Sequence, residues 1–277
     1  VMPREIDDVV ALLGFARAKS VPIVFRTGGT SLNGQAQTDS VLVDVRRYWQ
    51  RARVLDGGAS IRVQPGISLG RVNRMLARYG RKLGPDPAST DFACIGGVIA
   101  NNSGGMRCGT VADSYSTVRS MKLVLASGAV IDTAAADAEA AFAAAAPALS
   151  DGLASIRNQL RADSELAERV RQKFSIKNTT GYRLCAFLDA EDPLEIFRRL
   201  VIGSEGTLAF IAEAVFETVP LLPVTSVALV FFEDIEAAAA AVPELVAAGA
   251  KATELMVAPT LIAAAYNMPG TPERWRE

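Results

Sequence analysis

The chain has 277 residues, of which half are hydrophobic, with a formal net charge of −1 and no histidine. It is long enough for one large domain or two ordinary ones with a sizeable core. The nearly balanced charge, spread along the chain, gives no basis for binding nucleic acid or an anionic membrane. A histidine base and a histidine metal ligand are excluded within these residues.

The cysteines and the first residues of the chain indicate which metal sites and which cellular location to expect. Cys94, Cys108 and Cys185 are widely spaced, and the chain has no C-x-x-C pair, so we expect neither an iron–sulfur nor a zinc site in this chain. Free thiols suit a reducing cytoplasm. Acids stand where the apolar region of a signal peptide would begin, and no uncharged apolar run has membrane-spanning length. We therefore expect a cytoplasmic protein, free or bound peripherally at the inner face of the membrane.

The first predicted elements surround a glycine-rich loop. A helix is predicted over residues 4–19 and an apolar strand over 21–25; the loop, residues 26–34, comes next. Its glycines let several N–H groups turn toward one point, and Thr27, Thr30 and Ser31 add hydroxyl donors. This chemistry suits a phosphate or pyrophosphate. The alternative is a glycine-rich hairpin without a ligand.

The common nucleotide motifs do not fit this loop. A Rossmann fingerprint opens a helix, and a Walker loop needs G-K-[ST] with a helix behind it. Here a second strand, over residues 41–45, follows the loop. The predicted phosphate site is therefore a strand–loop–strand nest rather than a helix N-terminus.

Two more glycine-rich segments follow along the chain. After a predicted strand (61–64) and an amphipathic helix (69–79), a loop stiffened by prolines leads into the second segment, residues 95–105. This segment can bring backbone close to a flat or phosphorylated ligand, or can allow close helix packing, and both can hold at once. The third segment, residues 203–208, leads into an apolar strand.

The remaining patterns concern the periphery and the end of the chain. Strands are predicted over 118–126 and 129–131, and a helical insertion with a solvated face over 134–173. The composition shifts near Pro220-Leu221-Leu222-Pro223, a predicted domain boundary. Beyond it, we expect half of a split βαβ unit: a strand over 226–232, a helix over 235–248, a strand over 251–257 and a helix starting at 261–266.

Six phrases, taken together, resemble one family. They are Phe25-Arg26-Thr27-Gly28-Gly29-Thr30-Ser31, Leu83-Gly84-Pro85-Asp86-Pro87-Ala88-Ser89, Ile95-Gly96-Gly97-Val98, Asn101-Asn102-Ser103-Gly104-Gly105-Met106, Ile176-Lys177-Asn178-Thr179-Thr180-Gly181-Tyr182 and Gly203-Ser204-Glu205-Gly206-Thr207-Leu208. They resemble the FAD-binding domain shared by vanillyl-alcohol oxidase and p-cresol methylhydroxylase (PCMH). The nearest branch is that of D-lactate dehydrogenase and glycolate oxidase, especially long bacterial members in which a flavin dehydrogenase is fused to an iron–sulfur module.

The resemblance implies an α+β fold. A two-subdomain FAD-binding bowl of the PCMH type would occupy residues 1–221, with subdomains of about 1–55 and 56–221. The first half of a ferredoxin-like cap domain would occupy residues 222–277. FAD would lie between the subdomains, with its pyrophosphate on the first glycine-rich loop. The implied cofactor-binding residues are Thr27, Gly28, Gly29, Thr30, Ser31, Gly34, Pro85, Ser89, Thr90, Gly96, Gly97, Asn101, Ser103, Gly104, Glu205, Gly206 and Ile211.

Departures from the family pattern refine these expectations. Some relatives attach FAD covalently through a histidine at the position of Thr30, so FAD is expected to bind noncovalently here. Relatives end their second cap strand with Glu-Leu-Met-Asp, whereas Val257 follows Met256 in this chain. The catalytic histidines of the family lie further on, so catalytic residues are expected outside this chain, which would be a fragment that is inactive alone. Lys177, Tyr182 and Glu254 are the residues expected near the mouth of the site.

The expected function is that of an FAD-linked dehydrogenase. It would oxidise a 2-hydroxy acid such as D-lactate or glycolate, with hydride passing to the flavin and electrons to a fused iron–sulfur module or to the respiratory chain. The alternatives are a flavin dehydrogenase of another alcohol class and a flavin-binding module without turnover.

Overall fold

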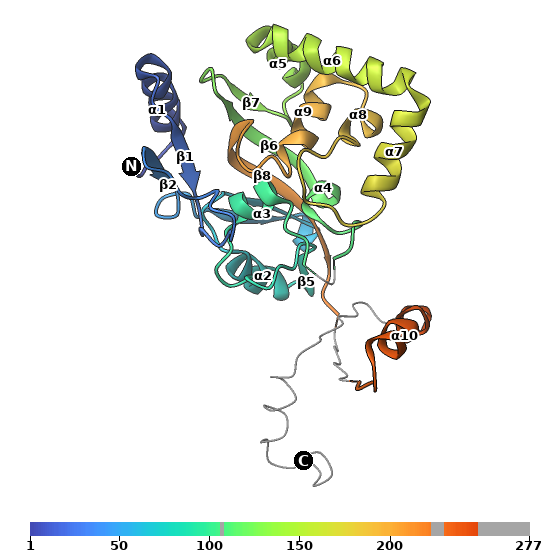
Figure 1. The fold of residues 1–277 in the computed structure, drawn as a ribbon. Coiled ribbons are helices and arrows are strands. Elements are labelled where there is room, and N and C mark those ends of the chain that lie inside the picture. Colours follow the sequence, from blue (N-terminus) through green and yellow to red (C-terminus); the bar gives the residue numbers. More distant parts are fainter. Residues whose placement is uncertain (106–107, 223–229, 249–277) are drawn as a thin grey trace. The chain divides into compact units, whose positions relative to one another are not determined.

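The structure, a computed structural model, describes residues 1–105, 108–222 and 230–248. Contacts between residues divide the chain into two units, Val1–Pro223 and Val224–Glu277. The first unit mixes helices with two sheets (Figure 1). The fold class predicted from the sequence is confirmed for this unit, whereas the assignment of the two units to a complete FAD-binding domain and a partial cap stays a prediction.

The smaller sheet holds the first glycine-rich loop. Helix α1 (Ile6–Lys19) precedes strands β1 (Ile23–Arg26) and β2 (Val41–Asp44), which pair in parallel. A tight hairpin joins antiparallel strands, so the parallel register excludes the hairpin alternative. The loop between β1 and β2 instead carries the chain back along the sheet. A strand–loop–strand arrangement was expected, and it is present.

The larger sheet has the strand order β3-β4-β8-β6-β7, and β5 also pairs with β8. Its strands are β3 (Ala52–Leu55), β4 (Ser60–Val63), β5 (Arg81–Leu83), β6 (Val118–Leu125), β7 (Val130–Asp132) and β8 (Ala209–Pro220). All these pairings are antiparallel. The 12-residue strand β8 is therefore central, since it pairs with β4, β5 and β6.

Both faces of the larger sheet are covered. On one face, Val124 and Phe210 pack with residues of α1 and β2, and Phe210 contacts the rings of Phe25 and Trp49. On the other face lies the larger core, to which eight helices labelled in Figure 1 contribute buried residues. These are α2 (Leu69–Ala77), α3 (Ile95–Asn101), α4 (Ser114–Thr117), α5 (Ala138–Ala145), α6 (Pro147–Ala162), α7 (Ser164–Phe174), α8 (Ala186–Asp189) and α9 (Pro193–Val201); a short 3-10 helix spans Asp56–Gly58.

Helices α5, α6 and α7 form the helical insertion with a solvated face that was expected over residues 134–173, since most of their residues are exposed. Each of these helices also buries an apolar stripe in the larger core. Phe142 is fully buried and stacks on Phe197 with 5.3 Å between ring centroids. The many alanines, which are apolar yet mostly exposed here, hid this stripe in the sequence.

The second unit is described in part. The predicted helix over 235–248 is present as α10 (Ile235–Ala247). Of the strand expected over 226–232, only residues 230–232 are described, and these are not in a strand. The other cap elements, over 251–257 and 261–266, lie outside the described residues. None of the helices in the described ranges combines the length and apolar character needed to cross a bilayer.

Candidate cofactor-binding site

The first two glycine-rich segments meet at the start of α3. A Cβ on Gly28 would lie 2.5 Å from the carbonyl oxygen of Phe92, so only glycine allows the loop to pass there. Thr27 lies over α3: a Cβ on Gly97 would be 3.1 Å from the Thr27 hydroxyl, and one on Gly96 would be 3.1 Å from its methyl group. Gly96 and Gly97 therefore serve close packing of helix against loop, one of the two roles predicted for them.

The third glycine-rich segment meets the other end of α3. The last carbonyls of a helix lack partners within it, and here the turn supplies donors. The backbone N–H of Gly203 donates to the Ile99 carbonyl at 3.0 Å, and that of Glu205 donates to the Ala100 carbonyl at 2.8 Å. All three glycine-rich segments, remote in sequence, thus converge on one seven-residue helix.

A polar trio links the second and third segments. The Asn101 amide donates to Glu205 Oε1 at 2.6 Å, and the Ser103 hydroxyl donates to Asn101 Oδ1 at 2.8 Å. All three side chains are half-buried, and none of the described residues donates to the other carboxylate oxygen of Glu205. An ionised carboxylate is an acceptor only, so Glu205 can receive a ligand hydroxyl.

The proline-containing loop lies beside the second segment. The backbone N–H of Asp86 donates to the Gly104 carbonyl at 2.8 Å, and Pro85 is buried. The Thr90 hydroxyl donates to the Pro87 carbonyl at 2.5 Å, while Ser89 is half-buried in the same turn. Asp86 thereby joins this loop to Gly104, and the channel role that the resemblance implies for Pro85, Ser89 and Thr90 stays a prediction.

Three predicted residues are placed differently. A Cβ on Gly34 or on Gly206 would meet no atom within 4 Å, so neither residue makes a close approach to protein. Ile211 lies within β8, opposite Leu123 of β6, and its side chain is buried in the larger core. These positions stay predictions as cofactor contacts.

Lys177 and Tyr182 tie their loop to the glycine-rich segments. Lys177 Nζ donates to the Gly105 carbonyl at 3.1 Å, and the hydroxyls of Tyr182 and Thr207 are hydrogen-bonded at 2.7 Å. Both residues therefore contact glycine-rich segments, and their place near the mouth of the site stays a prediction. Glu254, the third candidate, lies outside the described residues.

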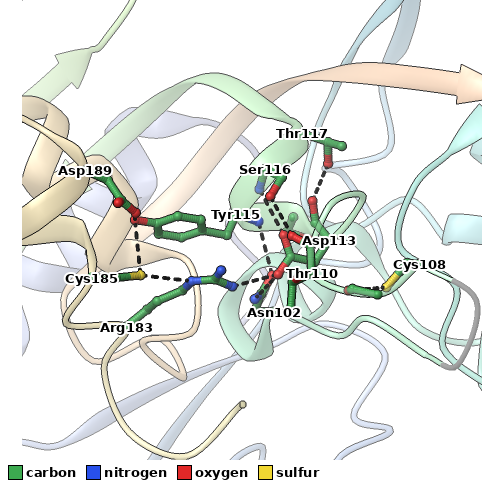
Figure 2. A network of polar contacts seen from close by, with 12 residues as sticks. Asn102, Cys108, Thr110, Asp113, Tyr115, Ser116, Thr117, Arg183, Cys185 and Asp189 are labelled. Atoms are coloured by element: carbon green, nitrogen blue, oxygen red, sulfur yellow. Dashed lines mark hydrogen bonds and ion pairs between the residues drawn. The ribbon is translucent and has the colours of Figure 1, made fainter. Parts of the chain in front are cut away.

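A buried polar network lies next to the C-terminal end of α3 (Figure 2). The Asp113 carboxylate accepts hydrogen bonds from Arg183 at 2.7 Å, Asn102 at 3.0 Å and the Ser116 backbone at 3.0 Å. The Arg183 guanidinium also lies 3.9 Å from the ring centroid of Tyr115. Asn102 caps α3 in a left-handed conformation, so the network fixes the end of that helix.

Tyr115 extends the network toward α8. Its hydroxyl donates to Asp189 at 2.7 Å, and burial together with this bond raises its pKa above the ordinary range. Arg183 Nε donates to Cys185 Sγ at 3.3 Å, and burial raises the pKa of that thiol. Sequence reasoning missed this network because its members span residues 102–189 and belong to no local motif.

Two surface hollows lie elsewhere. One, of about 360 Å³, is lined by Leu125, Leu208 and neighbouring residues, and another, of about 620 Å³, by the first residues of the chain. Neither is lined by a predicted cofactor residue. The candidate site is therefore defined by its donors and its backbone.

Those donors suit a phosphorylated ligand. Within the described residues, the backbone N–H groups of Gly29, Thr30 and Ser31 donate to no protein acceptor, and all three residues are exposed. Ser204 Oγ and Arg26 Nε are buried without a hydrogen-bond partner. Arg26 was not among the predicted site residues, although it directly precedes the loop.

Residues 1–134 match the family model of the FAD binding domain. The recognition made from the sequence is thus confirmed, and so is FAD as the cofactor. The first glycine-rich loop and the start of α3 both fall within the matched residues. The unpartnered donors of the loop fit the pyrophosphate of that cofactor.

Similar proteins include enzymes that act on hydroxy acids. The chain is 28% identical over 260 residues to a D-2-hydroxyglutarate dehydrogenase of Pantoea ananatis, covering 92% of this chain and 25% of the relative. It is 28% identical over 250 residues to the glycolate oxidase subunit GlcD of Bacillus subtilis, covering 90% and 42%. It is 26% identical over 247 residues to a D-lactate dehydrogenase of Archaeoglobus fulgidus, covering 88% and 44%. The chain thus spans a quarter to less than half of these relatives.

A solved structure supports the fold. Alkyldihydroxyacetonephosphate synthase matches with a TM-score of 0.50 and 19% identity, over 81% of this chain and 32% of the synthase. At this identity the likeness concerns the fold alone, an FAD-binding fold of mixed helix and sheet.

Proposed function

We propose that this protein is an FAD-dependent oxidoreductase that oxidises a 2-hydroxy acid. The observation that carries the proposal is the convergence of three glycine-rich segments on α3, within and next to an FAD binding domain. Relatives named for D-2-hydroxyglutarate, glycolate and D-lactate support the substrate class, since all three compounds are 2-hydroxy acids.

Each segment has a distinct role in this proposal. The loop 27–34 holds the pyrophosphate with backbone N–H groups and hydroxyls, and Glu205 accepts a hydroxyl of the cofactor. Thr30 cannot form the bond that a histidine forms, so FAD is held noncovalently. The bound flavin accepts the two electrons that the substrate loses. The base that takes the substrate's proton, and the electron acceptor, belong outside residues 1–277.

Flavin content and flavin reduction test the proposal. The purified protein should show the visible absorption of oxidised flavin, and acid precipitation should release free FAD into the supernatant. Anaerobic mixing with D-2-hydroxyglutarate, D-lactate or glycolate should then bleach the flavin when the base is present. Residues 1–277 alone should be bleached only by dithionite. Yellow colour in the acid pellet would contradict noncovalent binding, and bleaching by an aromatic or phosphorylated alcohol alone would favour another alcohol class.

Gly29→Val tests the location of the pyrophosphate. Gly29 has φ +65°, and a Cβ there would lie 2.8 Å from Arg26 Nε, so a side chain would distort the loop. We expect the dissociation constant of FAD to rise at least about tenfold, the equivalent of one charge-assisted hydrogen bond. Gly57→Val is the matched control, because Gly57 has φ +62° and open space around it. Equal FAD affinity in the two variants would place the pyrophosphate elsewhere.

A further inference from the structure

Arg26 is the last residue of β1, and its side chain folds back over the first glycine-rich loop. A Cβ on Gly29 would lie 2.8 Å from Arg26 Nε and 2.9 Å from Nη2, so the guanidinium rests against the loop backbone. The exposed donors of Gly29, Thr30 and Ser31 follow directly. A fixed positive charge is thus part of the same loop.

This guanidinium has no partner among the described residues. Its Nε is buried without an acceptor, and its side chain forms no ion pair with a described carboxylate. Asp44 lies opposite Arg26 in the parallel register, and the charge of Arg26 contributes, after that of Arg46, to lowering the Asp44 pKa. However, the Asp44 carboxylate is bound by Arg46, with contacts of 2.5 to 3.1 Å.

Arg198, whose side chain is buried, shows the usual arrangement of buried guanidinium donors. Arg198 bonds to Glu195 and to the carbonyl of Val118 at 2.7 Å. A buried donor without a partner loses its hydration and gains nothing in return, so native proteins seldom keep one without a ligand or water. The planar guanidinium matches phosphate oxygens, to which it can donate two hydrogen bonds.

We propose that the Arg26 guanidinium binds the pyrophosphate of FAD and supplies the positive charge that the loop otherwise lacks. This inference rests on the proposed function, and it adds a charged residue to a site predicted from backbone and hydroxyl donors. The ligand group is the diphosphate, which FAD shares with ADP and which riboflavin lacks.

Arg26→Gln removes the charge while keeping a polar side chain. We expect FAD and ADP to bind about tenfold to a hundredfold more weakly, as for the loss of a charge-assisted hydrogen bond, and riboflavin to bind with unchanged affinity. Flavin fluorescence measures FAD and riboflavin binding, and displacement of FAD measures ADP binding. Arg62→Gln is the matched control, because Arg62 is exposed on β4 and pairs with Glu213 at 3.5 Å. Unchanged FAD affinity, or an equal loss for riboflavin, would overturn the inference.

Salt dependence gives a second measurement that does not rely on one variant. The dissociation constant of FAD should rise with KCl concentration in the wild type and in Arg26→Lys, and should rise less steeply in Arg26→Gln. Equal slopes in all three proteins would overturn the role of Arg26 as a charge. A wild type that binds no FAD would refute the proposed function itself, whereas a wild type and an Arg26→Gln variant of equal affinity would refute only this inference.

Discussion

Glu205 has a backbone conformation that residues other than glycine seldom adopt. Its φ is 53°, and Gly206 follows with φ 78°. Two hydrogen bonds stabilise this conformation. The backbone N–H of Glu205 donates to the Ala100 carbonyl, and the Asn101 amide donates to the Glu205 carboxylate. The carboxylate is therefore fixed before any ligand arrives, which favours a role in binding.

Replacing this carboxylate should weaken FAD retention. For Glu205→Ala we expect about a tenfold higher dissociation constant, because a charged acceptor is lost and Asn101 is left unpaired. The rate at saturating FAD should be nearly unchanged. Glu217→Ala is the control, since Glu217 is exposed on β8 and pairs with Arg119 at 3.4 Å. A large loss of rate at full FAD occupancy would instead assign Glu205 to the chemistry.

Among the elements, helix α9 carries a buried arginine that is paired with a carboxylate. Arg198 has a side chain that is 6% exposed, and it bonds to Glu195 of the same helix, as does Arg199. Burial alone would raise the pKa of Glu195, but the hydrogen bonds and charges of the two arginines lower it below its ordinary value. The ionised form of Glu195 thus stabilises the fold.

This arrangement predicts a pH dependence. Because the pKa is lower in the folded state, the stabilisation is present above the unfolded pKa of about 4.3 and is lost as pH falls through the folded value. Glu195→Gln should lower the free energy of unfolding by about 1–3 kcal/mol at pH 7, and less at pH 3. Urea unfolding from pH 7 to pH 3 measures the difference. Glu139→Gln, on an exposed position of α5, should show no such trend.

Periodicity predicted the elements that have a regular face. The helices α1, α2 and α10 and the strands β1, β2, β4, β6 and β7 are all present near their expected residues. The short strands β3 and β5 escaped notice because they depend on remote partners, β4 and β8. Helix α3 was hidden by Gly96 and Gly97, which have poor helix propensity and are retained for packing against Thr27.

The residues themselves predicted a phosphate nest at the first glycine-rich loop, but the assembly of the three segments into one site was predicted only through the resemblance. Local spacing indicated that each glycine-rich segment could approach a phosphate, but it held no information on their meeting at α3. The ion pair of Arg183 with Asp113 joins residues 70 positions apart, and no short-range pattern encodes it. Arg26 lay next to a recognised loop, yet its unpartnered state depends on Asp44 being bound by Arg46.

For the molecule as a whole, the contacts predict that the first unit folds without the second. Residues 1–222 should unfold cooperatively and bind FAD as tightly as residues 1–277. Residues 1–208, which lack β8, should not fold, because β4, β5 and β6 all pair with that strand. Limited proteolysis and thermal unfolding by circular dichroism compare the three chains. A folded 1–208 chain would contradict the central role of β8.

The position of β8 has a consequence for synthesis of the chain. Thr218 of β8 bonds to the carbonyl of Gly58, a residue 160 positions earlier. At about 5–20 residues per second, roughly 8–30 s separate the translation of these two residues. During that time β4 and β6 leave the ribosome with unpaired edges, which are prone to pairing with other chains. The nascent protein should therefore need chaperones until β8 is made.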